Sequence, residues 1–301
     1  MYEKAALLTF YAETPIHMGS GQSVSYVDLP IQRERHTSFP VLWASGIKGV
    51  IRNIALRKWN DKDKVNTIFG PDPEDASDYA SCISITDAKI LLYPVRSVKG
   101  VFAWITCPFV LKRFKEDLKA IRGIFEIDYQ KIDVPDDKVL IANDNLKIQN
   151  KNTVALEEFL FEAEVNDEVK KIAENLEKFI PTNDLTSDLE NHLAIVSDNV
   201  FKDFVNYAVE IRTRIRIDQA KGTVKEGALF SEELVPSESV FYSLLFIKDS
   251  FKPNSNMIAE NVFLEIKSLL SENSLLQLGG DETIGRGLVR IKFYSPQGGQ
   301  Q

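Results

Sequence analysis

The sequence predicts an α+β fold, a ferredoxin-like domain with large insertions and a protruding β-hairpin. The recognisable elements follow the order strand, helix, two strands, late helix and final strand, which is the β-α-β-β-α-β order of ferredoxin-like domains. A long acidic segment interrupts this order, and a polar, turn-rich segment separates two later strand-like runs. These two segments predict the insertion and the hairpin.

Composition indicates a folded protein with a large core. With 301 residues, of which 44% are hydrophobic and 27% charged, the chain is long enough for one elaborated domain or two ordinary ones. Its apolar runs, such as residues 241–247, are too short to span a bilayer, and its start lacks the features of a signal peptide. We therefore expect a cytoplasmic protein without a membrane partner. Cys82 and Cys107 are expected to be buried thiols.

The first strand and helix have clear signals. The run KAALLTFYAET is apolar and rich in strand-forming residues, and Thr14-Pro15 ends it. Ser45 is then expected to cap a helix, on which Lys48 and Arg52 share one face. The opposite face carries the predicted core stripe, formed by Ile47, Val50, Ile51 and Ile54.

The middle of the chain is acidic and less regular. The segments SCISITDAKI and LLYPVRS read as two short strands, and residues 108–121 read as a helix. Residues 123–165 give weak signals that favour an irregular excursion, whereas residues 167–179 show helical periodicity. Residues 124–204 hold 19 acidic and 8 basic residues, a net charge of −11, so the acidity belongs to an insertion.

The last third of the chain returns to strands. Residues 205–217 end in an alternation of isoleucine and arginine that predicts a strand with one wet, basic face. The polar segment 218–238 then predicts a protruding hairpin before a strand at 240–247. A helix around residues 258–269 and the strand LVRIKFY complete the fold, and the tail 296–301 is expected to be disordered.

A loop suited to phosphate lies in residues 14–53. Glycines give it freedom, and His17 and Asp28 are its free acid/base candidates. A carboxylate such as Asp28 can hold a divalent cation against a phosphate or accept a proton. His17 fits either an acid/base role or a hydrogen bond to the backbone. Six basic residues oppose the single acid Glu34 between residues 31 and 58: Arg33, Arg35, Lys48, Arg52, Arg57 and Lys58.

The glycine-rich segment 278–287 is not a Walker A loop. Arg286 replaces the lysine, Gly287 replaces the hydroxyl residue, and a strand follows where a helix should begin. Two interpretations stay open: a tight glycine turn, or a surface on which RNA backbone approaches the peptide with Arg286 on a phosphate. The spacing of His36 and His192 does not predict a structural zinc site.

Several of these motifs resemble one protein family. The runs TPIHMGSG, VDLPIQRERHTSFPVLWASGIKGVIRN and LGGDETIGRGLVRI, with AKILLYPVRSVKGVFAWITCPFVLKRF and FYSLLF between them, resemble the RAMP superfamily and, within it, the backbone subunits of type III-B CRISPR (Cmr) effector complexes. The resemblance implies a single RAMP domain over residues 1–301. Its RNA-recognition-motif-like palm would comprise residues 1–122 and 205–295, its acidic insertion 123–204 and its thumb hairpin 218–238.

The resemblance also implies a cleavage site. Asp28 stands where the family carries its cleavage activity, with a divalent cation, Mg²⁺ or Mn²⁺, as cofactor. Glu232 best matches an acidic residue near the cleavage site, and His17 is a candidate partner. Phe230 and Leu234 stand in a region where tyrosine or tryptophan is common, so a tyrosine role in catalysis is not expected, although Phe230 fits a wedge between bases.

RNA contacts are expected around the first helix and the glycine-rich turn. The family uses the Ser-x-Lys-Gly region to hold guide RNA, whereas the residues alone also fit a solvated helix face. Glycines on the charged side of the helix favour close approach of a ligand. The expected RNA-binding residues are Ser45, Lys48, Gly49, Arg52, Arg33, Arg35, Gly279, Gly280, Arg286 and Phe230.

The function implied is a backbone subunit, used in antiviral defence, that cuts target RNA paired to a guide. Its expected partners are guide RNA, single-stranded target RNA, other Cmr subunits and copies of itself stacked in a helical filament. Two alternatives are a non-catalytic RNA-binding scaffold, and a stand-alone, metal-independent endoribonuclease that trims guide precursors. A cleavage assay with and without chelator distinguishes the three.

Overall fold

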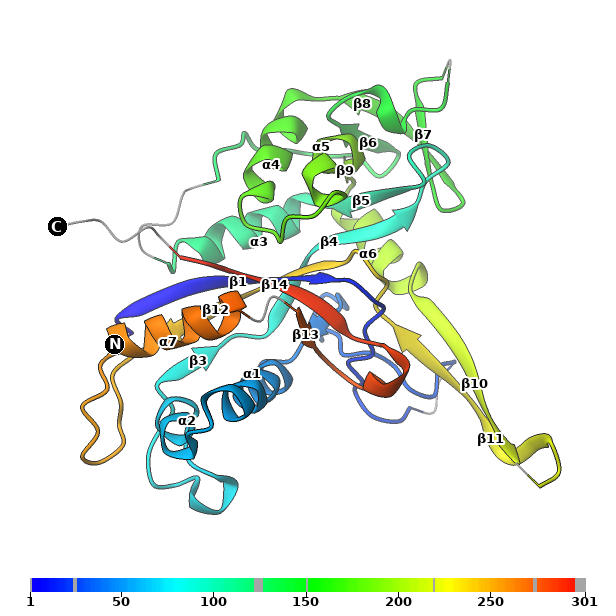
Figure 1. Cartoon of the computed structure of the whole chain (residues 1–301). Coiled ribbons are helices and arrows are strands. Elements are labelled where there is room, and N and C mark those ends of the chain that lie inside the picture. Colours follow the sequence, from blue (N-terminus) through cyan, green and yellow to red (C-terminus); the bar gives the residue numbers. More distant parts are fainter. Residues whose placement is uncertain are drawn as a thin grey trace.

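One large sheet organises the molecule (Figure 1). The computed structural model describes residues 2–23, 26–121, 127–149, 151–218, 220–272 and 275–295. Within these residues, twelve strands join into a single mixed sheet, and two more form a separate hairpin. The expectation of a mixed α+β protein is confirmed.

The centre of the sheet is an antiparallel ladder. Its order is β14 (Leu288–Tyr294), β1 (Lys4–Ala12), β12 (Val240–Ile247) and β4 (Ala88–Arg96). Residues 6–12 of β1 are all buried, because layers cover the strand on both faces and neighbours flank both edges. This double burial explains why β1 is a continuous apolar run rather than an alternating one.

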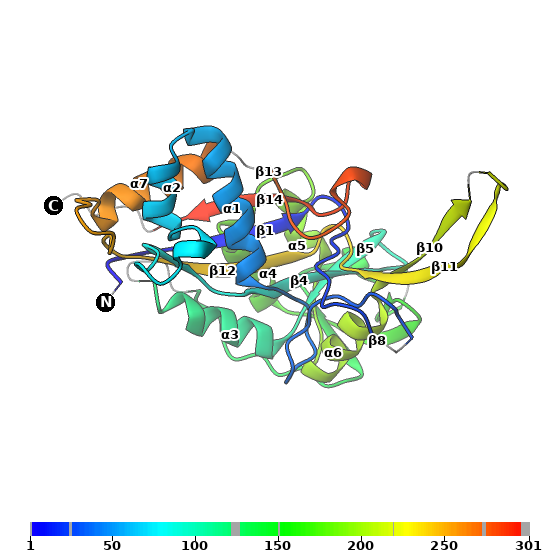
Figure 2. The ribbon, with the colours of Figure 1, turned by 90° about the horizontal axis from the view of Figure 1, so that it is seen from below.

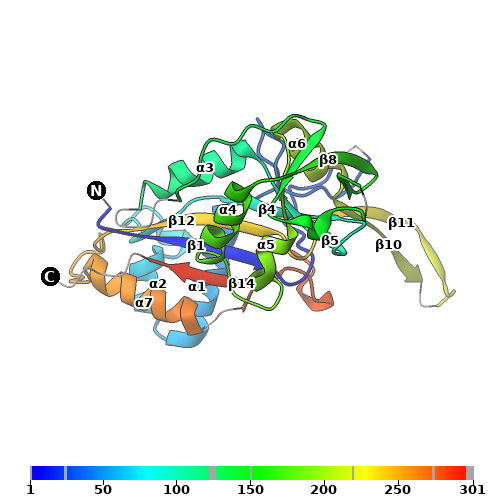
Figure 3. The same ribbon diagram turned by 90° about the horizontal axis from the view of Figure 1, so that it is seen from above.

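Helices lie on both faces of this ladder. On one face lie α1 (Ala44–Trp59), α2 (Lys62–Phe69) and α7 (Ala259–Glu272), which Figure 2 shows from their own side. On the other face lies α3 (Pro108–Leu118), and Figure 3 shows it with α4 (Asp167–Glu177) and α5 (Leu189–His192) over the strands. No described helix is both long and apolar enough to cross a membrane.

The acidic middle segment extends the sheet. From β4 the order continues through β5 (Phe102–Thr106), β9 (Leu193–Ile195), β6 (Lys138–Ile141), β8 (Phe159–Val165) and β7 (Thr153–Leu156). The prediction that residues 123–165 are irregular is therefore wrong for their described part. Strands as short as β6 and β7 show too few residues for a period, and their pairing with distant strands forms them.

The predicted position of the break between β3 and β4 is also wrong. Sequence favoured two strands in residues 81–97, split after Ile90, but the structure has β3 (Ile83–Ile85), a break at Thr86-Asp87 and then the long β4. The smaller elements are β2 (Val41–Leu42), β13 (Leu275–Gln277) and 3-10 helices at Pro73–Asp75, Asp144–Leu146, Thr186–Asp188 and Glu282–Ile284.

A two-stranded hairpin projects from the body (Figures 1 and 2). It follows α6 (Asp198–Tyr207) and consists of β10 (Glu210–Asp218) and β11 (Thr223–Leu234), so it begins earlier than the predicted range 218–238. The isoleucine face of β10, which the alternation placed in the core, is also exposed. No described layer of this chain lies against the projecting part, so the alternation does not correspond to burial here.

Candidate functional site at the base of the hairpin

The glycine-rich loop before α1 lies along the base of β11. Ile16 and Val235 exchange two backbone hydrogen bonds of 2.9 Å, and Leu29 N donates to Ser231 O at 3.1 Å. Glu233 N in turn donates to Leu29 O at 3.0 Å. These bonds place residues 28–31 beside β11 like a short additional strand, with a parallel bridge between Leu29 and Glu232. The loop and the hairpin base therefore form one unit.

Asp28 is exposed but firmly held. Its Oδ2 accepts hydrogen bonds from the backbone N of Ser231 at 2.7 Å and from its hydroxyl at 2.8 Å, and Asp28 N donates to Ser231 Oγ at 3.0 Å. The backbone hydrogen bond first, and then the hydroxyl, lower the pKa of Asp28. Asp28 is therefore an ionised carboxylate at neutral pH, fixed by a residue that is remote in sequence. The sequence shows no local partner for Asp28, and its partner in the structure, Ser231, lies 203 residues away.

The donor set around Asp28 fits a cation that is shared with another ligand. Within the described residues, no group of three or more His, Cys, Asp and Glu side chains forms a metal site. Both hydrogen bonds from Ser231 reach Oδ2, and no hydrogen bond to Oδ1 is recorded within the described residues. Mg²⁺ in proteins commonly uses one or two carboxylates and takes its other ligands from phosphate and water.

His17 lies in a slot between two glycines. A Cβ on Gly19 would come within 2.8 Å of His17 Nε2, and one on Gly280 would lie 3.6 Å from Cδ2. His17 Nδ1 lies 2.8 Å from the carbonyl oxygen of Glu233, so Nδ1 carries a proton and donates this hydrogen bond. Of the two roles left open by the sequence, the structure shows the hydrogen bond to the backbone.

Glu232 is buried, although carboxylates on a protruding hairpin are ordinarily solvated. Its side chain is 2% exposed, because the loop strand covers the base of β11. Its carboxylate oxygens lie 3.7 Å from His17 Nδ1 and 3.4 Å from Arg214 Nη1. Burial raises the pKa of Glu232, and a hydrogen bond with Asp281 adds to the rise, while His17 and Arg214 oppose it.

Asp281 and Arg214 join this cluster although the sequence did not single them out as site residues. Arg214 Nη1 donates to Asp281 Oδ2 at 2.6 Å. Burial acts to raise the pKa of Asp281, but the hydrogen bonds from Arg214 and Glu232 outweigh it and hold this pKa below its usual value. The signal available in sequence was an acid within the glycine-rich turn and an arginine in the alternating strand, with nothing to pair them.

Glu233 anchors the loop through Arg33. Glu233 Oε2 accepts from Ile31 N at 2.9 Å, and Oε1 pairs with the Arg33 guanidinium. Arg33 also donates to the carbonyl oxygens of Ser38 and Val205, both at 2.9 Å. Its guanidinium therefore holds protein segments together, and the RNA contact expected of Arg33 stays a prediction. Arg35 is exposed in the following turn.

Ser45 does not cap α1. The residue at the N-cap is Trp43, which makes no side-chain capping bond, and Ser45 lies exposed within the first turn. The helix start is held from outside, since Ala44 N donates to Asp87 Oδ1 at 2.7 Å and Trp43 N donates to Gln32 Oε1 at 2.8 Å. A remote acceptor thus does what the sequence assigned to the local serine.

Lys48 and Arg52 are half-buried rather than solvated. Arg52 donates to Gly70 O and Asn66 Oδ1, both at 2.8 Å, and pairs with Asp72 Oδ1 at 3.1 Å, so it fastens the end of α2. Burial and the neighbouring Arg52 lower the pKa of Lys48. Gly49 faces open space on the same helix. Of the two basic residues, Lys48 is the one that fits an external anion.

The glycine-rich turn packs on the loop that carries His17. A Cβ on Gly279 would lie 2.2 Å from His17 O, and one on Gly287 would lie 1.9 Å from Leu278 O, so both positions need glycine for the protein's own backbone. Gly280 N donates to His17 O at 2.8 Å. The interpretation as a tight turn therefore accounts for these glycines. Arg286 is half-buried, and its Nε has no hydrogen-bond partner among the described residues.

Phe230 lies beside Arg214 on the hairpin. It is partly exposed, and the guanidinium carbon of Arg214 lies 5.5 Å from the centre of its ring. The cation covers one side of the ring, as in other arginine–aromatic contacts. This position agrees with a ring at the boundary between the hairpin base and its projecting part.

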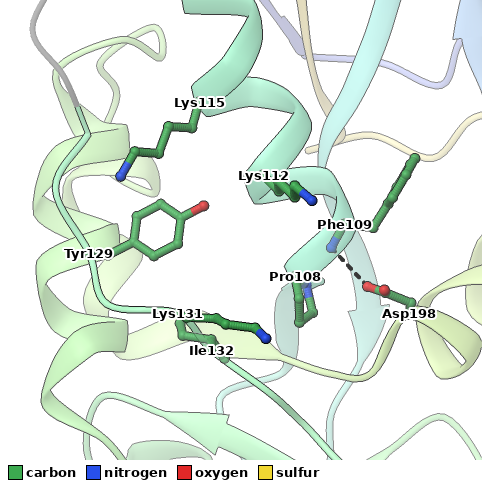
Figure 4. Close-up of a pocket in the computed structure, with 8 residues that line it drawn as sticks. All are labelled: Pro108, Phe109, Lys112, Lys115, Tyr129, Lys131, Ile132 and Asp198. Atoms are coloured by element: carbon green, nitrogen blue, oxygen red, sulfur yellow. Dashed lines mark hydrogen bonds between the residues drawn. The ribbon is translucent and has the colours of Figure 1, made fainter.

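A separate basic cavity of about 390 Å³ lies at the N-terminal end of α3 (Figure 4). Lys115 Nζ lies 5.1 Å from the Tyr129 ring centre, and Asp198 Oδ1 accepts from Phe109 N at 2.8 Å. None of its residues belongs to the cluster around Asp28. The lining residues are Pro108, Phe109, Lys112, Lys115, Tyr129, Lys131, Ile132 and Asp198.

Comparison with known proteins gives the chain a family. The family model for the RAMP superfamily matches residues 9–290. A protein of Pyrococcus furiosus named CRISPR system Cmr endoribonuclease Cmr4 is 41% identical over 292 residues, covering 96% of this chain and 95% of that protein. The chain belongs to the RAMP superfamily, as a member of its Cmr4 proteins. The resemblance inferred from the motifs is thus confirmed.

Solved structures of RAMP superfamily members agree over nearly the full length. The crystal structure of oligomeric Cmr4 from Pyrococcus furiosus has a TM-score of 0.75 at 34% identity, covering 98% of this chain and 99% of that one. A chain of the type III-B Cmr-beta complex bound to cognate target RNA, seen by cryo-EM, has a TM-score of 0.74 at 26% identity, covering 97% and 98%. The RAMP fold therefore extends through the acidic segment.

Proposed function

We propose that this chain is a guide-RNA-binding backbone subunit of a type III-B CRISPR effector complex, which cleaves complementary target RNA at regular intervals in a metal-dependent reaction. The relative at 41% identity is named an endoribonuclease, and a structural neighbour belongs to a complex bound to target RNA. These names support RNA as the substrate class and a complex of several subunits as the setting. The site itself supports the chemistry.

The observation that carries the proposal is the position of Asp28. It is an exposed, ionised carboxylate that Ser231 holds at the point where the hairpin leaves the body. RNA cleavage through the 2′-oxygen requires this oxygen to lie in line with the departing 5′-oxygen, which regular A-form geometry prevents. A hairpin that pushes nucleotides apart beside a fixed carboxylate supplies both needs at one place.

In this reaction Asp28 accepts the proton of the 2′-hydroxyl. The 2′-oxygen then attacks the adjacent phosphorus, the bond from phosphorus to the 5′-oxygen breaks, and the 5′-oxygen takes a proton from solvent. Asp28 would hold the Mg²⁺ or Mn²⁺ ion, which would supply charge that neutralises developing negative charge on the phosphate. His17 and Glu232 act behind Asp28, since both are nearly buried and hydrogen-bonded within the protein.

The fold elements take roles in RNA binding. We assign β14, β1, β12 and β4, with α1 and α7, to a ferredoxin-like palm, and the β10–β11 hairpin to a thumb. The RNA-facing groups that the protein's own contacts leave accessible are the charges of Lys48, Arg35 and Arg286, the open space at Gly49 and the partly exposed ring of Phe230.

The proposed partners are guide RNA, target RNA, other subunits of the complex and further copies of this chain. Self-association is supported by the oligomeric crystal structure of the Pyrococcus furiosus relative. Stacked copies would bring one Asp28 each to the paired target, which explains cleavage at a regular interval. The interval would equal the number of nucleotides that one copy covers.

The test is a cleavage assay with the reconstituted complex. Labelled RNA complementary to the guide is incubated with Mg²⁺, with chelator, and with the isolated chain in place of the complex. The proposal expects evenly spaced products with the complex and Mg²⁺ only. Intact target under all conditions would indicate a scaffold, and cutting by the isolated chain in chelator would indicate a metal-independent nuclease.

A further inference from the structure

Besides the backbone hydrogen bonds of the loop strand, several side-chain contacts tie the base of the hairpin to the body, including three that link a side chain of each part. Asp28 hydrogen-bonds Ser231, and Arg33 pairs with Glu233, so both of these ties hold β11. The third tie joins Arg214 to Asp281. Among the described residues, Arg214 is the residue of β10 whose side chain hydrogen-bonds outside the hairpin. Strand β10 therefore depends on this ion pair for its side-chain attachment to the body.

Arg214 lies where the hairpin changes direction. It pairs across the ladder with Phe230, and the next pair towards the body is Thr213 with Ser231. The ladder register shifts between Ile215 and Ile217, immediately beyond Arg214, and the hairpin then projects in a curve (Figure 2). Arg214 is thus the last anchored position before the projecting part, one ladder step from the serine that holds Asp28.

Asp281, the partner of Arg214, lies in a tightly packed turn. Asp281 has left-handed backbone (φ 59°), which Asp tolerates better than most residues, within the turn that Gly279 and Gly287 lock against backbone. Its side chain is 20% exposed and that of Arg214 is 35% exposed, so water only partly screens the pair. Glu232, whose side chain is 2% exposed, lies 3.4 Å from the same guanidinium nitrogen.

We propose that Arg214 and Asp281 are positioning residues for the cleavage site. Their ion pair fixes the direction of the hairpin and, through the pairing of β10 with β11, holds Ser231 and therefore the Asp28 carboxylate in place. This proposal rests on the proposed function for its effect on cleavage, whereas its effect on the hairpin is independent of that function. Neither residue needs to touch RNA.

The chain offers suitable variants and a matched control. Arg214→Gln and Asp281→Asn each remove one charge of the pair, and Asn also tolerates left-handed backbone. Arg216→Gln removes the same charge two residues further along β10, where Arg216 is exposed and forms no ion pair that the structure records within the described residues. Thermal unfolding of each variant checks that the body stays folded.

The direction of the hairpin can be measured without RNA. Spin labels on cysteines introduced at Lys221, at the hairpin tip, and Lys267, on α7, report the distance between hairpin and body, since Cys82 and Cys107 are buried. We expect Arg214→Gln and Asp281→Asn to broaden the distance distribution and Arg216→Gln to leave it unchanged. Equal distributions in all variants would overturn the proposal, whatever the chain's activity.

Cleavage by the reconstituted complex gives the second readout. We expect both variants to lower the single-turnover rate at saturating target by roughly tenfold, since a misplacement of about 1 Å can cost about a hundredfold. Target affinity should stay within about twofold, and the double variant should be no slower than either single one, as for residues that act as a unit. A broadened hairpin with full cleavage would overturn the positioning role.

Discussion

Asp28 and Ser231 are separated by 203 residues, yet the serine decides the state of the carboxylate. Sequence could single out Asp28, because an acid in a glycine-rich loop with basic neighbours is a recognisable pattern. It could not find Ser231, Asp281 or the burial of Glu232, because these depend on how the loop, the hairpin and the glycine-rich turn meet. Contacts between residues so far apart in the chain leave no periodic pattern in the local sequence.

The first prediction concerns the pKa of Asp28. Ser231→Ala removes the hydroxyl hydrogen bond that lowers this pKa, although the backbone bond, the larger cause, persists. The pKa of Asp28 should therefore rise towards its ordinary value, and the acid limb of the pH–rate profile should move to higher pH. Single-turnover cleavage measured between pH 4 and pH 8 checks this shift, and Ser231→Thr, which keeps a hydroxyl, is the control. A limb that moves to lower pH would contradict the account.

Lys48 and Arg52 share one face of α1 but differ in their contacts, since Arg52 binds the end of α2 and the loop after it. Lys48→Ala should lower the slope of log affinity for guide RNA against log salt by about 0.7–0.9, the value for one phosphate contact, with little loss of stability. The salt titration needs only the binding assay. An unchanged slope would mean that Lys48 makes no contact with an RNA phosphate.

Arg52→Ala should act mainly on stability. It removes the contacts with Gly70, Asn66 and Asp72 that fasten α2, so the free energy of unfolding should fall by about 1.5–3 kcal/mol, the scale of hydrogen bonds to charged groups. Denaturant unfolding measures this loss. If Arg52→Ala changed the salt slope as much as Lys48→Ala while leaving stability intact, the structural role given to Arg52 would be wrong.

The glycine-rich turn offers a matched pair of substitutions. Gly279 and Gly285 both have left-handed backbone, so alanine at either should cost about 1–2 kcal/mol. A Cβ at Gly285 meets open space, whereas one at Gly279 would meet the carbonyl oxygen of His17. Gly279→Ala should therefore be clearly the more destabilising in thermal unfolding. Equal effects would imply that the turn does not pack on the His17 loop.

Across the whole chain, the helices and strands that could be predicted are those with strong local sequence signals. The final strand was predicted with its observed limits, 288–294, and the helix predicted from 108 ends at 118 rather than 121. Both have clear boundaries, a proline at the helix start and a glycine turn before the strand. The strands of the acidic segment were missed because long-range pairing, rather than pattern, forms them.

The hairpin shows what the sequence could not delimit. Its polar, turn-rich centre was recognisable, but residues 231–235 proved to be part of the body, where Glu232 to Val235 are buried. Replacing residues 222–236, which lie within the predicted hairpin range 218–238, should therefore damage the loop that holds Asp28. The projecting part begins only beyond Arg214.

Asp28 is proposed to cut target RNA, and removal of its carboxylate tests this role. Complexes containing the native chain, Asp28→Ala or the control Asp78→Ala, an exposed aspartate in another loop, are incubated with labelled target RNA and Mg²⁺. Asp28→Ala should lower the cleavage rate by at least about 100-fold, which is within the range for a lost general base. Assembly of the complex and its affinity for target RNA should not change. Asp78→Ala should cut normally. Undiminished cleavage by the Asp28→Ala complex would contradict the account.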